Sequence, residues 1–125
     1  MRRNHRGFTL IELIVVMAIV SLLLTLAAPR YFRSIDRSKE TILKANLDAT
    51  RDALDKFHAD TGRYPEQLDE LVSRHYLRSL PWDPIAESAE SWVIVPPADG
   101  NAGAVYSISS SATGTGTDGS SYAQW

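Results

Sequence analysis

An apolar segment over residues 8–28 constrains this chain more than any other feature of its sequence. A helix needs about 20 such residues to cross a bilayer, which is the length of this segment. Glu12 is its only charged residue, and its other polar side chains are hydroxyls that can bond to their own helix: Thr9, Ser21 and Thr25. A carboxylate in lipid costs about 2.5–3.5 kcal/mol on insertion scales, and less near the membrane edge. We therefore expect Glu12 to have a partner.

A short basic leader precedes this segment and predicts its orientation. Arg2, Arg3 and Arg6 lie before Gly7, and positive charge beside a span favours the cytoplasmic side. The bulk of the chain then lies outside the cytoplasm, in the periplasm if the cell has two membranes. A conventional secretory signal fits less well, because its apolar region has about 7–15 residues and ends at a small-residue cleavage site. An uncleaved signal anchor is the plainer alternative to a processed leader.

The overall composition allows one small domain in addition to the membrane segment. The chain has 125 residues, a net charge of −2 and no cysteine. A nearly neutral chain gives no reason to propose nucleic acid as a partner. Without cysteine, no disulfide can stabilise the exported part.

The apolar segment continues into a second helical stretch. We expect one helix over residues 8–59, kinked by Pro29, which lacks an amide hydrogen and crowds the preceding turn. The helix should stop near Asp60, with Gly62 as its left-handed cap.

The stretch after Pro29 is amphipathic. Its apolar residues recur at helical spacing on one broad face: Ile35, Ile42, Leu43, Leu47, Ala49, Ala53, Leu54 and Phe57. Its charged residues fall mostly on the other face: Asp36, Arg37, Glu40, Lys44, Asp48, Arg51, Asp52 and Asp55. Glu40 and Lys44 have the spacing of a favourable ion pair on that polar face. The pattern predicts a helix that is apolar all round in its first half and packs one face on a sheet in its second.

Shorter elements follow the long helix. Residues 65–72 indicate a short helix with proline in its first turn, and the prolines of residues 76–84 indicate a loop. Residues 91–95 and 104–109 are typical of two antiparallel strands. A third short strand is expected over residues 121–125.

No pattern of side chains indicates catalysis. His58 and His75 are isolated from each other and from any ligand-spaced acid, and His5 lies in the leader. The serines lack a Gly-x-Ser-x-Gly elbow, and no strand or lysine accompanies Gly114-Thr115-Gly116 as in a phosphate-binding loop. We interpret the chain as non-catalytic, with no catalytic residue and no firm metal site.

Two motifs carry a resemblance to a known family. Residues 6–12, Arg-Gly-Phe-Thr-Leu-Ile-Glu, resemble the prepilin leader of type IV pilins and of the pseudopilins of type II secretion systems. A Gly-x-Tyr-Pro element at residues 62–65, a leucine-rich turn and Leu-Pro-x-Asp-Pro at residues 80–84 resemble the major pseudopilin. The expected fold is α+β, a long kinked N-terminal helix packed on a small antiparallel sheet. The expected parts are a leader over 1–7, a transmembrane or filament-core helix over 8–28 and a periplasmic pilin-like domain over 29–125.

The resemblance also implies a function. In this family the prepilin peptidase cuts between the residues that correspond to Gly7 and Phe8, and the new N-terminal Phe8 is N-methylated. The resemblance favours a pairing of Glu12 with the α-amine of Phe8 on a neighbouring subunit, which would set the register between subunits. The expected partners are further copies, minor pseudopilins and the inner-membrane secretion platform. The expected product is a periplasmic pseudopilus that drives type II secretion.

Two other functions stay open at this point. A type IV pilin or minor pilin, used for adhesion, motility or DNA uptake, shares the same leader. A monomeric membrane-anchored binding module is the alternative from a different class.

The loop over residues 109–120 raises the question of calcium. In the major pseudopilins that the chain resembles, the C-terminal loop holds a calcium ion through aspartates and backbone oxygens. Here Asp118 is the loop's only carboxylate, whereas calcium takes about six to eight oxygen ligands. We favour a flexible loop pinned by Trp125 and retain Asp118 as a weak calcium candidate.

Overall fold

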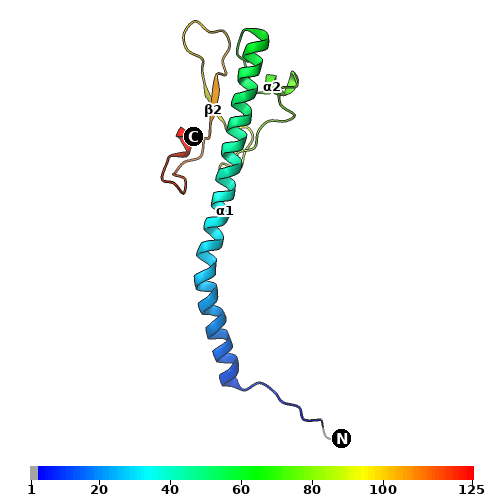
Figure 1. The fold of residues 1–125 in the computed structure, drawn as a ribbon, viewed down its shortest axis with the longest axis vertical. Helices are drawn as coiled ribbons and strands as arrows, with labels where there is room; N and C mark the ends of the chain where they lie inside the picture. The colour runs from blue at the N-terminus through cyan, green and yellow to red at the C-terminus, as the bar shows by residue number, and fades with distance from the viewer. Residues whose placement is uncertain (1–2) are drawn as a thin grey trace. The chain divides into compact units, whose positions relative to one another are not determined.

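The computed structural model describes residues 3–125, so Met1 and Arg2 of the predicted leader lie outside the described residues. The chain divides into two compact units, with the boundary between Ile35 and Asp36. Helix α1 (Leu10–Thr61) contributes its first part to one unit and its remainder to the other (Figure 1). The second unit also holds α2, two strands and a 3-10 turn. This confirms the predicted α+β fold.

Helix α1 has 52 residues and includes Pro29. It ends close to the predicted position, because Gly62 takes a φ of +76° and its amide donates to the His58 carbonyl at 2.8 Å. Glycine reaches this left-handed conformation without a steric penalty. The helix is continuous through Pro29, so the proline does not end it, and the kink there stays a prediction.

The core of the second unit forms on one face of the distal half of α1. Its fully buried helical side chains are Leu43, Leu47, Leu54 and Phe57, which meet Leu71, Val105 and Ile108 from the rest of the unit. Three members of the predicted apolar face are not fully covered: Ile42 is 49 % exposed, Ala49 is also exposed, and Ile35 is half-buried. The small sheet covers a narrower strip of the helix than the apolar pattern predicted.

The sheet has two antiparallel strands, β1 (Val93–Val95) and β2 (Ser107–Ser109). Ile94 lies opposite Ile108, whose side chain is fully buried, and β2 runs alongside the distal half of α1 in Figure 1. The predicted third strand is wrong. The chain instead forms η1 (Tyr122–Gln124), a 3-10 turn, in which the rings of Tyr122 and Trp125 pack edge to face at 4.9 Å. Folding these two rings together needs a turn rather than an extended backbone.

Helix α2 (Asp69–Ser73) begins later than predicted. The carbonyl of Pro65 accepts bonds from Ala104 and Val105, and the amide of Tyr64 donates to Ala102. This pairing holds the chain extended before α2. Gly103, at φ +104°, lies so close to the Tyr64 backbone that any Cβ would clash with it.

Candidate assembly site

The predicted processing point lies in accessible, irregular backbone. Residues 3–9 precede α1 and are exposed, and Phe8 is 92 % exposed. A side chain at Gly7 would meet no neighbouring atom. The Gly7–Phe8 bond therefore lies in exposed backbone, and its cleavage stays a prediction.

Thr9 caps the start of α1. Its hydroxyl accepts a hydrogen bond from the backbone amide of Glu12 at 3.2 Å. This is one half of a capping box, in which a Ser or Thr side chain satisfies an amide three residues on, at a position often held by glutamate. The Thr-x-x-Glu spacing was the sequence signal for this cap, and the bond involves the backbone amide of Glu12, not its carboxylate.

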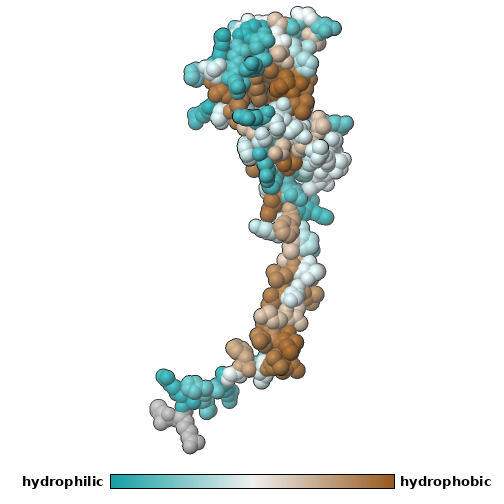
Figure 2. Space-filling model, turned by 180° about the vertical axis from the view of Figure 1, so that it is seen from behind, coloured by the Kyte–Doolittle hydropathy of each residue, from teal (hydrophilic) through white to brown (hydrophobic). Residues whose placement is uncertain are grey.

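The first unit exposes almost all of its apolar side chains. Every large hydrophobic residue from Phe8 to Leu26 is at least 45 % exposed. Figure 2 shows this as a mostly hydrophobic surface, interrupted by paler patches, along the N-terminal part of α1. By length and composition, α1 is the one helix of the described chain that could cross a membrane, and its most apolar window is not buried. Exposing this surface to water costs free energy, because apolar side chains are stable in lipid or against other apolar helices.

Glu12 lies within this apolar surface. Phe8, Ile11, Val15 and Val16 line a shallow hollow with it. Within residues 3–125, no cation lies within ion-pair distance of its carboxylate. In lipid, a carboxylate among apolar side chains needs a counter-charge, and residues 3–125 of the same copy place none beside Glu12.

Glu40 is buried, and its predicted place on the polar face of the helix is wrong. The residue is only 6 % exposed. Its two oxygens accept bonds from the amide of Thr117 at 2.8 Å, the hydroxyl of Thr117 at 2.7 Å and the hydroxyl of Tyr122 at 3.1 Å. Desolvation alone would raise the pKa of Glu40, but these bonds outweigh it and hold the pKa below its usual value.

The expected ion pair between Glu40 and Lys44 is also wrong. Lys44 lies 3.9 Å from Asp118 and 4.3 Å from the centre of the Trp125 ring. The cause is that the C-terminal loop packs on α1 and offers each of the two helical side chains a closer partner. Through Glu40, Lys44 and Trp125, the loop is attached to the helix at several points.

The surroundings of Asp118 do not fit a calcium ion. One of its oxygens already accepts bonds from the amide and hydroxyl of Ser120, at 3.0 and 2.6 Å. The other faces the ammonium of Lys44, and among residues 3–125 no group of three or more acids, histidines or cysteines could hold a metal. The bonds from Ser120 hold the pKa of Asp118 below its usual value.

Two further polar residues join the loops to the core without having been predicted to do so. Arg51 donates to the Ser107 hydroxyl at 3.1 Å and to the carbonyls of Ile108 and Trp125. Asp83 is 1 % exposed; it accepts from the amides of Ile85 and Ala86 and from the Ser110 hydroxyl. An Asp-Pro pair favours such a turn, so the motif was visible, but the Ser110 partner was not.

The two histidines of the second unit lie in different surroundings. His58 stacks on Tyr64 at 4.3 Å between ring centres, and His75 is exposed.

Comparisons with known proteins give this geometry a family. Residues 2–28 match the prokaryotic N-terminal methylation motif. The chain is 34 % identical over 99 residues to type II secretion system core protein G of Pseudomonas aeruginosa, covering 66 % of this chain and 70 % of that protein. The chain belongs to the core protein G family of type II secretion systems. Members of this family are structural pseudopilins, and this chain is accordingly a membrane-anchored pseudopilin.

The chain is also similar to a further core protein G and to a type IV pilin. Core protein G of Xanthomonas campestris is 32 % identical over 73 residues, or 58 % of this chain and 51 % of that protein. The type IV major pilin of Myxococcus xanthus is 39 % identical over 68 residues, or 54 % of this chain and 31 % of that pilin. No solved structure matches the chain significantly.

Proposed function

We propose that this core protein G family member is a filament subunit. The apolar surface of its N-terminal helix is covered by the helices of other copies, which also neutralise Glu12. The observation that carries the proposal is the exposed apolar surface of the first unit, within which Glu12 has no ion pair to any of residues 3–125. Cleavage between Gly7 and Phe8 would create an α-amine four residues before that carboxylate in sequence. The amine of one copy then neutralises Glu12 of another, so that assembly removes both the exposed surface and the lone charge.

The partners and location follow from this proposal. The chain is inserted in the bacterial inner membrane, with its leader in the cytoplasm and residues 29–125 in the periplasm. Prepilin peptidase removes the leader, and Phe8 is N-methylated. The processed chains polymerise with one another and with minor pseudopilins on the inner-membrane secretion platform. The role is structural and non-catalytic, and needs no nucleic acid and no cofactor.

A type IV pilus subunit is the second candidate. The similarity to the Myxococcus xanthus pilin favours it, because that protein is a pilus component by name. Both candidates use the same helix and the same Glu12 pairing. Deletion of the chain's gene separates them: loss of exoprotein secretion supports the pseudopilus, and loss of surface pili with secretion intact supports the pilus.

The test of the proposed function is the Glu12→Ala variant, expressed with the processing and assembly proteins. We expect normal insertion and normal loss of the leader, but absence from filaments seen by electron microscopy. Leu22→Ala, in the same apolar segment, is the matched control and should still assemble. Normal assembly of Glu12→Ala would overturn the pairing, and a parent chain that stays monomeric would overturn the filament function.

A further inference from the structure

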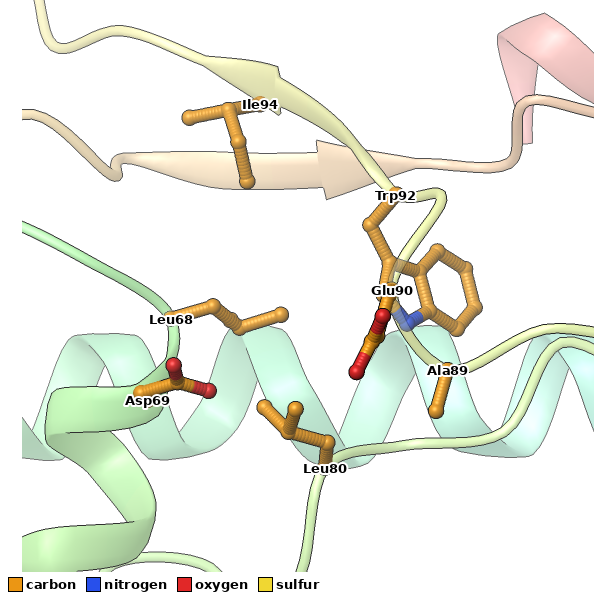
Figure 3. A pocket seen from close by; sticks show the side chains of 7 residues that line it. All are labelled: Leu68, Asp69, Leu80, Ala89, Glu90, Trp92 and Ile94. Carbon is orange, nitrogen blue, oxygen red and sulfur yellow. The ribbon is translucent and has the colours of Figure 1, made fainter.

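A hollow in the second unit combines an apolar floor with an acidic rim (Figure 3). Its lining residues, called here the acidic groove, are Leu68, Asp69, Leu80, Ala89, Glu90, Trp92 and Ile94. Trp92 is 8 % exposed and its indole N–H donates to the Pro81 carbonyl at 2.8 Å, which fixes one wall. Figure 3 shows the carboxylates of Asp69 and Glu90 on either side of the two leucine side chains.

The two acids of the groove have no cation of their own. Asp69 and Glu90 are exposed, and within residues 3–125 neither forms an ion pair. Glu70, the neighbour of Asp69, differs because it binds Arg63 at 2.5 Å and lies 3.7 Å from Arg74. Arg63 and Arg74 therefore face Glu70, whereas Asp69 and Glu90 present negative charge beside the apolar surface of the groove.

The first unit carries the complementary surface. Arg30 and Arg33 are three residues apart on α1, which places them on neighbouring positions of one helix face, about 4.5 Å apart along the axis. Leu26 and Pro29 line the same shallow notch. We call these four residues the arginine face. All are exposed, and within the described residues neither arginine forms an ion pair.

We propose that the arginine face of one copy docks in the acidic groove of a second copy; this rests on the proposed polymerisation. Arginine stems and Leu26 would cover the apolar floor while the guanidinium groups reach the rim carboxylates. Charge complementarity of this kind selects partner and register more than it adds affinity. The contact adds a second register point between copies, separate from the pairing of Glu12.

Crosslinking tests the contact directly because the chain has no cysteine. One tagged chain carries Arg33→Cys and a differently tagged chain carries Glu90→Cys, and both are co-expressed with the processing and assembly proteins. A short bismaleimide should yield a heterodimer, which no contact within one chain can produce. Asp99→Cys, at an exposed turn, replaces Glu90→Cys as the matched control and should give little heterodimer.

A charge swap then tests the proposed contact between Arg30 of one copy and Asp69 of the other. Arg30→Glu in the first chain should slow heterodimer formation about five-fold, the effect of losing one exposed ion pair worth up to about 1 kcal/mol. Asp69→Arg in the second chain should restore the rate.

The outcomes separate this proposal from the proposed function. Filaments that form without the heterodimer, or a swap that restores nothing, overturn the docking and leave the filament function intact. If Arg30→Glu instead weakens membrane retention whatever stands at position 69, the arginines bind lipid phosphates and the docking is again overturned. If the unsubstituted chain forms no filaments, the filament function itself fails.

Discussion

The two halves of α1 carry one important glutamate each, and the two are satisfied in opposite ways. Glu40, in the distal half, accepts three hydrogen bonds from Thr117 and Tyr122 and is almost fully buried. Glu12, in the first half, is exposed among apolar side chains and forms no ion pair within the described part of the chain. The same contrast holds for the hydrophobic residues, because Leu43, Leu47 and Phe57 are fully buried while those up to Leu26 are not.

This difference shows that the two halves of the helix bury their apolar side chains in different ways. The strands, α2 and the C-terminal loop of the same chain cover the apolar face of the distal half. Among residues 3–125 the apolar side chains of the first half, from Phe8 to Leu26, stay exposed, so we expect its stability to depend on lipid or on other copies. Substitution of buried residues in the distal half should therefore affect folding, and substitution of Glu12 in the first half should affect assembly.

The largest expected effect on folding comes from Phe57. Phe57→Ala should lower the free energy of unfolding by about 3–5 kcal/mol, because it removes a fully buried ring and leaves a cavity. Leu22→Ala removes an exposed side chain and should change unfolding little. Denaturant unfolding of the full chain in detergent, followed by circular dichroism, compares the two. Equal losses in both variants would erase the distinction between the halves.

A smaller effect is expected at Glu40. Glu40→Gln should cost about 1–3 kcal/mol at pH 7, because a buried set of bonds loses its charged acceptor. The folded pKa lies below the ordinary 4.5, so this stabilisation is present above about pH 4.5 and is lost as the pH falls through the folded pKa. Melting curves of the two proteins should thus converge at acid pH. Asp55→Asn, at an exposed position of the same helix, is the control and should stay near the parent at every pH.

The smallest expected effect is that of calcium. Because Asp118 is engaged by Ser120 and faces Lys44, we expect millimolar calcium or a chelator to leave the melting temperature unchanged. Isothermal titration of the purified chain should give no heat of binding. A rise of several degrees with calcium would show that the loop rearranges into an ion site.

The sequence predicted the long helix, its cap at Gly62 and the antiparallel pairing of the two strands, because periodicity and turn residues are local signals. It misplaced Glu40 because a polar residue is assigned to the solvent face unless its partner is known, and Thr117 lies 77 positions away. The same reason hid the Ser110 partner of Asp83 and the three contacts of Arg51. Glu12 could be predicted as an assembly residue from sequence because a charge in an apolar run is a local anomaly, and its role stays a prediction.

The most direct test of the account is the distance between Glu12 and Phe8 of different copies. Filaments are grown from a mixture of chains, some carrying ¹³C-labelled glutamate and the others ¹⁵N-labelled phenylalanine, and solid-state NMR measures dipolar dephasing between the Glu12 carboxylate and the Phe8 α-amine. If the two groups pair between copies, the dephasing should correspond to a distance within about 4 Å, as in an ion pair. Filaments that contain only one of the two labels should show no dephasing. Intact filaments that show no such coupling would contradict the claim that a second copy neutralises Glu12.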